Sequence, residues 1–445
     1  MEAVGEGAKA SLVMAAVLVT AHAVLAYWVP SRTRTRARSS VAGLQVLVNF
    51  AAVETREYNQ EPAREALSSL FHIIYSGTHS PLEVRRAAVI NLLQEKEDRC
   101  RDLGFEALAA ALKADHFTTH FGSDFGSRSR DYGWRPKTAE EVRSWFVSWF
   151  DLCREIDSAK GDDANRIRII IADAFRGLWG VREIRSNLVA LSEDLIAEQS
   201  WPEGWLAIKR VLRWDISKDD VSALKLATCL EKQLRPIDLV TEVKARIFAK
   251  GIAAFDVADE DDEESASSAH EKASRYAEKL GEKVANDTDA LGQVENYLIS
   301  REYSQTAYAF GRGLGKSYPN VAALLSRIRD LIAQSASDKI SLIPVRGLIS
   351  GWSSVDPEAA EEFFENAISD EVWSAWFVEL QVQQDMNDTA FERLMCAIRD
   401  GRTPLWQFRY LAGGRATDPF SPDQIGALVS ELNKLDRMAA LSPLI

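Results

Sequence analysis

A triplet of residues recurs after 34 residues in the second half of this 445-residue chain, and few folds produce a repeat of this length. Arg312-Gly313-Leu314 returns as Arg346-Gly347-Leu348, and a related triplet, Arg409-Tyr410-Leu411, comes further on. Each triplet precedes a proline-started helical pattern, and these patterns occupy 319–331, 357–368 and 422–432. A helical pair of roughly 30–45 residues, repeated in tandem, buries its apolar face only against its neighbours. The repeat therefore predicts an α-solenoid.

Helical periodicity also runs through the first half of the chain. Apolar residues recur at helical spacing in the ranges 41–54, 62–75, 81–95 and 102–112. Within 81–95 the residues expected to face inward are Val84, Ala87, Ala88, Ile90, Leu92 and Leu93. Thr138-x-x-Glu141 is a capping box, and Trp145, Phe146 and Trp149 form the apolar stripe of the helix that follows it. Only 13 prolines and 24 glycines occur, which favours an all-α fold over a turn-rich β fold.

The stretch Ala10–Val29 is long and apolar. Its only plainly polar members are Ser11, Thr20 and His22. A helix of this length spans about 30 Å, the thickness of a bilayer core. Because arginines follow at 32, 34, 36 and 38, the positive-inside rule places the rest of the chain on the cytoplasmic face of the membrane. We expect a single-pass anchor. A buried helix of a soluble cytoplasmic protein and a cleaved signal peptide are the two other interpretations.

The expected organisation has four parts. Residues 1–40 hold the hydrophobic helix and its arginine-rich flank, residues 41–250 hold helical repeats with an ordered loop at 115–137, residues 251–266 form an acidic linker, and residues 267–445 hold further repeats. The linker is predicted because seven acidic residues fall within 256–264, where they repel one another and have little apolar surface to bury.

Charge and cysteine content narrow the classes of partner and compartment. The net charge of −13 argues against a general nucleic-acid binder and favours a protein partner with a basic patch. No two of the four cysteines form a C-x-x-C pair, which indicates free thiols in a reducing compartment. The 12 tryptophans are expected to fill wide gaps between helices.

Two patterns resemble catalytic motifs but lack a required residue. The segment Gly311–Ser317 ends like a P-loop, yet Phe310 stands where the first glycine belongs, and a helical pattern rather than a strand precedes it. We expect its glycines to form a break between helices. His116 and His120 have the spacing of zinc ligands on a helix, but Phe117 replaces the glutamate of H-E-x-x-H. We therefore expect no catalytic residue and no cofactor, and these two histidines remain an alternative site for a metal-dependent enzyme.

The loop at 121–137 is the strongest candidate for binding a ligand or partner. Helical periodicity stops there, and arginines alternate with aromatic residues. Guanidinium groups and exposed rings recognise carboxylates, phosphates or bases. The candidate binding residues are Arg128, Arg130, Tyr132, Trp134 and Arg135. The alternative is a structural plug that packs on the helices, with Asp131 paired to an arginine.

The residues described above support a resemblance to a known class of protein. Residues 80–93 resemble one helix of a HEAT-type repeat, so the helical pairs are expected to be HEAT/TPR-like. Residues 130–146 and the Arg-Gly-Leu repeats of 300–435 resemble the helical sensor regions of bacterial STAND-type conflict proteins. In that family the repeats act as a sensor or partner-binding arm behind a nucleotide-binding domain, which has no counterpart in this sequence. The resemblance therefore implies a scaffold role only.

We expect a non-enzymatic scaffold that binds a protein partner or ligand and is tethered to the membrane. One alternative is a soluble sensor subunit of a bacterial defence system that works with a separate NTPase. A nucleic-acid-binding solenoid would require basic residues clustered on one concave face.

Overall fold

The computed structural model describes residues 34–54, 62–117, 132–197, 199–217, 220–248, 266–301, 303, 305–413 and 415–441. Within these ranges the secondary structure is helical, and one isolated bridge between Ser300 and Ile340 is the only β pairing. The all-α prediction is confirmed for this part of the chain. The apolar stretch at 10–29, most of the predicted loop and most of the acidic linker lie outside it. No helix in the described ranges is long and apolar enough to cross a membrane.

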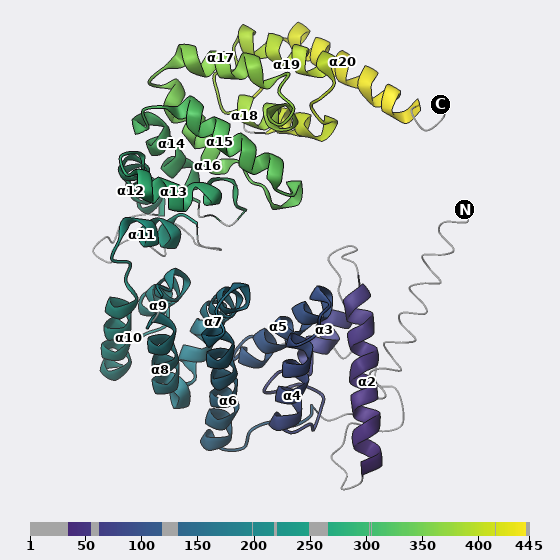
Figure 1. Cartoon of the computed structure of the whole chain (residues 1–445), viewed down its shortest axis with the longest axis vertical. Coiled ribbons are helices and arrows are strands. Elements are labelled where there is room, and N and C mark those ends of the chain that lie inside the picture. The colour runs from purple at the N-terminus through teal and green to yellow at the C-terminus, as the bar shows by residue number, and fades with distance from the viewer. Residues whose placement is uncertain are drawn as a thin grey trace. The chain divides into compact units, whose positions relative to one another are not determined.

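The chain divides into two compact units, Met1–Leu234 and Arg235–Ile445. Unit 1 contains α2 (Arg34–Val53), α3 (Pro62–Ser69), α4 (Leu82–Leu93), α5 (Asp98–Leu112), α6 (Ala139–Ser158), α7 (Asp162–Gly180), η1 (Arg182–Ile184), α8 (Arg185–Ile196), α9 (Pro202–Trp214) and α10 (Val221–Leu234) (Figure 1). Each of α5, α6 and α7 packs against the next helix and also against the next but one.

The predicted cap and stripe of α6 are present. The Thr138 hydroxyl accepts a hydrogen bond from the Glu141 N–H at 3.2 Å, and the Glu141 carboxylate accepts one from the Thr138 N–H at 3.3 Å. The three stripe residues are buried. On α4, Leu92 is buried as predicted, but Val84 and Ala87 are exposed, and Arg85 and Val89 are buried instead.

Buried tryptophans fill the interior of unit 1, as expected from their number. Five of them are among its largest fully buried side chains: Trp145, Trp149, Trp179, Trp201 and Trp205. Three of these indoles donate to a buried acceptor, which offsets the cost of desolvating the N–H group. Trp145 donates to the Ala111 carbonyl, Trp201 to the Arg168 carbonyl and Trp205 to the Glu231 carboxylate, at 3.0, 3.2 and 2.9 Å respectively.

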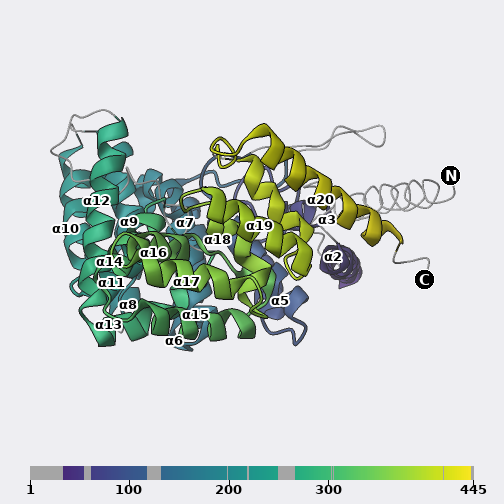
Figure 2. The same cartoon turned by 90° about the horizontal axis from the view of Figure 1, so that it is seen from above.

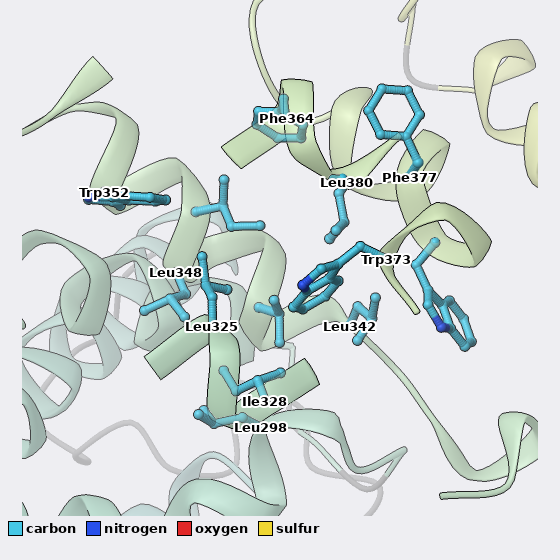
Figure 3. Packing of buried hydrophobic residues seen from close by; sticks show 14 of the residues in the cluster. Leu298, Leu325, Ile328, Leu342, Leu348, Trp352, Phe364, Trp373, Phe377 and Leu380 are labelled. Atoms are coloured by element: carbon cyan, nitrogen blue, oxygen red, sulfur yellow. The ribbon is translucent and has the colours of Figure 1, made fainter. Parts of the chain in front are cut away.

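Unit 2 contains α11 (Leu239–Arg246), α12 (Ala266–Ala285), α13 (Thr288–Val294), η3 (Glu295–Ile299), α14 (Ala307–Ser317), α15 (Val321–Gln334), η4 (Ser337–Lys339), α16 (Ile343–Ser353), α17 (Pro357–Ala367), η5 (Trp373–Trp376), α18 (Phe377–Gln381), α19 (Asp388–Asp400), η6 (Leu405–Ala412) and α20 (Pro422–Leu441). One apolar cluster runs through these helices. Figure 3 shows Leu325 and Ile328 of α15 near Leu342 and Leu348, with Trp373, Phe377 and Leu380 continuing the cluster.

Glycines set the closest helix contacts of unit 2, and their positions correct the expected inter-helix break. Gly311, Gly313 and Gly315 all lie inside α14. A Cβ on Gly311 or Gly315 would overlap backbone carbonyls of α16, and a Cβ on Gly313 would overlap the Glu278 carbonyl of α12. In a helix interior, glycine lets neighbouring backbones approach directly. The motif that resembled a P-loop is therefore a packing surface between helices that lie side by side (Figures 1 and 2).

The spacing of the two Arg-Gly-Leu triplets has a structural counterpart. The helices α12, α14 and α16 pack in this order. Gly347 of α16 lies against the Tyr308 carbonyl of α14, and Gly313 of α14 lies against α12 in the same way. Gly281 of α12 faces the following helix, α14, as Gly315 of α14 faces α16. Gly281 and Gly315, and likewise Gly313 and Gly347, are 34 residues apart, as the two triplets are. The two glycines of each pair thus take equivalent positions in successive helices.

Candidate partner-binding site

The structure describes the last part of the predicted binding loop, from Tyr132 onward. Arg128 and Arg130 lie outside the described residues. The backbone of Tyr132 and Trp134 pairs with the turn before α4: the Gly77 N–H donates to the Tyr132 carbonyl at 3.1 Å, and the Trp134 N–H donates to the Thr78 carbonyl at 2.8 Å. These two hydrogen bonds fix the segment on unit 1.

Gly133 makes this close pairing possible. Its φ is +80°, a conformation that L side chains rarely adopt. A Cβ at this position would lie 2.5 Å from the Thr78 amide nitrogen. The glycine is thus required both by its backbone conformation and by the lack of space.

The buried guanidinium of Arg85 organises the turn beneath the segment. It donates to the carbonyls of Ser80, His72 and Thr78 at 3.0, 2.9 and 3.1 Å, and to the Ser76 hydroxyl at 3.1 Å. Among the described residues no carboxylate pairs with it, and burial lowers its pKa to about 9. This explains why a charged residue occupies the inward face of α4: the guanidinium supplies donors to the carbonyls of Ser80 and His72.

Trp134 packs inward against this guanidinium. The Arg85 Cζ lies 6.0 Å from the Trp134 ring and 5.2 Å from the Trp145 ring, within the range of cation–π attraction. The two indoles stack at 5.5 Å with an interplanar angle of 21°. Trp134, a candidate binding residue, therefore has the geometry of the plug alternative and anchors the segment.

Two tyrosines lie on the exposed side of the same segment. Tyr132 is 57% exposed and Tyr75 is 40% exposed, and their rings meet edge to face at 5.3 Å. Tyr75 has φ +57°, which is uncommon for a residue other than glycine. Arg135, two positions beyond Gly133, is also exposed. We use the name tyrosine surface for the Tyr75–Tyr132 pair together with Arg135, the exposed residue three positions after Tyr132.

The sequence did not single out Tyr75 or Arg85. Tyr75 meets Tyr132 only through the tertiary pairing of its turn with the loop, and its sole local signal is the Ser-Gly dipeptide that follows it. Arg85 has the pattern of a polar residue of an amphipathic helix, where exposure is the normal expectation.

The two histidines of the alternative metal site are not brought together by any described contact. His116 has φ +50°, and its Nε2 lies 3.7 Å from Asp115 Oδ2. Its side chain is 90% exposed. His120 lies outside the described residues. In the part of the chain that the structure describes, no group of three or more His, Cys, Asp or Glu side chains is arranged to hold a metal ion.

His72 is a titratable group that the sequence left unassigned. Burial, with help from Lys113 and Arg85, lowers its pKa to about 4. Its ring meets Phe117 edge to face at 5.3 Å. It is therefore neutral at pH 7, and its ring packs against Phe117.

Known proteins provide no match from which a role for this chain could be transferred. No family model matches the chain, and neither a curated protein nor a solved structure shows significant similarity to it.

Proposed function

We propose that the protein is a non-enzymatic scaffold that binds a protein partner through the tyrosine surface. The observation that carries this proposal is the exposed Tyr75–Tyr132 pair, fixed from below by Gly133 and by Trp134 on Arg85. Tyrosine and arginine are enriched among residues that dominate protein interfaces, and a ring held in place before binding loses little entropy on binding. Arg128 and Arg130 precede this surface in the chain and are candidates for its extension.

We also propose that the helices form a solenoid of HEAT/TPR-like pairs. Two observations support this architecture: helices pack against the next but one in both units, and equivalent glycines recur at the spacing of the Arg-Gly-Leu triplets. In such arrays the stacked units present long surfaces for partners. The resemblance to sensor regions of STAND-type proteins suggests one version of this role, a sensor subunit beside a separate NTPase. Copurification of an NTPase with the full chain from its native cells tests that version.

Photo-crosslinking tests the tyrosine surface. Benzoylphenylalanine is placed at position 75 or 132 of the full chain in its native cells, and Tyr276, which is 40% exposed on α12, provides a matched control position. We expect the same partner to be captured from positions 75 and 132 but not from position 276. Absence of an adduct at the two positions, or the same adduct at all three, would contradict the proposal.

The membrane tether at Ala10–Val29 stays a sequence prediction. Fractionation of the full chain against a version starting at Ser40 tests it. The tether predicts that only the full chain sediments with membranes, and recovery of both forms in the soluble fraction would contradict it.

A further inference from the structure

The segment η6 sorts its side chains onto three edges. A 3₁₀ helix has three residues per turn, so residues three apart lie above one another. One edge carries Leu405, Phe408 and Leu411, the second carries Gln407 and Tyr410, and the third carries Trp406, Arg409 and Ala412. The first edge is largely buried and the second is buried or half-buried, while the third is exposed along its whole length.

The two inner edges fix η6 on η5 and α18. Phe408 and Leu411 belong to the apolar cluster of unit 2. The Gln407 side chain is fully buried, and its Oε1 accepts a hydrogen bond from the Glu379 N–H at 3.1 Å. Just before the helix, the Thr403 hydroxyl donates to the Ser374 carbonyl at 2.9 Å. The outer edge is therefore presented on a well-anchored backbone.

The outer edge combines an exposed indole with a stacked guanidinium. Trp406 is 46% exposed, and its ring meets Trp376 edge to face at 6.1 Å. The Arg409 Cζ lies 5.1 Å from the Trp406 ring and 5.2 Å from the Tyr410 ring. Stacking between two rings restricts the arginine while leaving its charge on the surface.

Arg409 forms no ion pair with a carboxylate of the described residues, as is also the case for Arg275, Arg301 and Arg399, whereas other arginines of unit 2 do. The arginines with an ion pair to a carboxylate include Arg246 with Glu242, Arg312 with Glu278, Arg327 with Glu295, Arg329 with Asp370, Arg346 with Glu379, Arg393 with Glu361, Arg402 with Asp400 and Arg415 with Asp418. The charge of Arg409 does act on the buried Glu379 carboxylate, but Arg346 is the residue paired with that group. What distinguishes the position of Arg409 is an exposed guanidinium held on an exposed indole. It is complementary to a carboxylate that has an apolar neighbour.

We propose that the outer edge of η6, with Leu405, is a docking surface for an acidic, apolar peptide segment of a partner protein. A carboxylate of the peptide pairs with Arg409, and an adjacent apolar side chain packs on Trp406 and Leu405. Charge complementarity selects this occupant. A nucleic acid also offers anions and stacking rings, but it brings many negative charges to a chain of net charge −13, whereas the proposed segment needs a single carboxylate at Arg409. This surface lies in unit 2 and does not depend on the tyrosine surface of unit 1.

Peptide selection tests the proposal. A random peptide library displayed on phage is selected on the full chain and counter-selected on the Trp406→Ala, Arg409→Glu double variant. We expect the enriched peptides to carry Asp or Glu beside an apolar residue. Synthetic copies, measured by fluorescence anisotropy, should lose about tenfold or more in affinity for either single variant, as expected of an interface anchor.

Arg415→Glu is the matched control, because Arg415 is highly exposed but already paired with Asp418. It should leave peptide affinity unchanged, and circular dichroism should show that all variants keep the helical fold. Selection of basic or uncharged peptides, or of none that distinguishes the double variant, overturns the proposal. So does self-association of the chain that Trp406→Ala abolishes, or binding of a single-stranded RNA oligonucleotide that Arg409→Glu abolishes. Loss of peptide binding with unchanged crosslinks at Tyr132 separates this surface from the proposed scaffold site.

Discussion

Gly313 packs directly on the backbone carbonyl of Glu278, with no side chain between α14 and α12. On the other side of α14, Gly311 and Gly315 make the same kind of contact with α16. Where two helix backbones touch directly, Cα–H groups lie against carbonyl oxygens. This contact is weakly attractive and recurs at close helix interfaces. Methyl groups at these positions have no room, and this gives a direct test of the packing.

The substitution Gly313→Ala should destabilise unit 2. The added methyl group overlaps a backbone atom that cannot rotate away, and overpacking of this kind costs about 1–3 kcal/mol. Gly292→Ala in α13 is the control, because a Cβ there meets nothing within 4 Å. The Gly292→Ala substitution should instead raise the free energy of unfolding by about 0.5–1 kcal/mol, because alanine is favoured over glycine in a helix interior. Urea unfolding followed by circular dichroism measures both, and equal effects at the two positions would refute the backbone contact.

The substitution Arg85→Ala should destabilise unit 1 by at least about 2 kcal/mol, because it removes the side-chain donor of the Ser80 and His72 carbonyls. The adjacent Arg86 pairs with Glu155 at the surface, so Arg86→Ala should cost about 1 kcal/mol or less. The comparison requires only the free energies of unfolding of the two variants. If they are alike, Arg85 does not have the organising role assigned to it.

The substitution Gly133→Ala should destabilise the chain and abolish crosslinking from position 132. Two effects contribute at Gly133, the positive φ and the lack of space for a Cβ. Gly161 separates them, because its φ is +87° but a Cβ there meets nothing within 4 Å. Gly161→Ala should therefore show only the cost of its backbone conformation, φ +87° and ψ −162°, which is about 1–3 kcal/mol for an L residue. Thermal melts compare the two variants. A larger loss for Gly133→Ala is expected, and a smaller one would argue against its close contact with Thr78.

Stability should fall as the pH is lowered from about 6.5 to about 4. His72 has a folded-state pKa of about 4 against 6.5 for the free side chain, so in this interval the unfolded chain binds a proton that the folded chain does not. Because the ring is partly exposed, we expect a contribution of roughly 2 kcal/mol. Urea melts at several pH values measure it. His72→Phe should flatten this part of the profile, His116→Gln should not, and an unchanged slope in the His72 variant would exclude His72 as its source.

The sequence predicted features that depend on neighbours along the chain. The capping box of Thr138 and Glu141 and the buried stripe of Trp145 and Trp149 follow from spacing within one helix, and the structure shows both. It predicted the glycines of α14 wrongly, because glycine has the same local signal at a helix break and at a close helix contact. Which of the two occurs depends on a second helix, whose approach is not encoded locally.

In the candidate site too, some features follow from the local sequence and others depend on tertiary contacts. Tyr132 and Trp134 stood out as aromatic residues in an interrupted pattern, yet their opposite orientations depend on the position of Thr78, which belongs to a turn before α4 and is distant in the sequence. Arg85 could not be assigned from periodicity, since burial of an arginine depends on acceptors that the turn at 72–80 supplies. Local patterns thus located the segment, and tertiary hydrogen bonds determined which of its side chains remain available.

The glycine contacts also bear on how unit 2 responds to force. Helices separated by side chains can slide past one another by small rotamer changes, which is the usual basis of shear motion. Where α12, α14 and α16 touch through their backbones, no side-chain layer exists to accommodate such sliding. These three helices should therefore behave as a stiff section, and elastic bending of unit 2 should concentrate in the elements on either side of it.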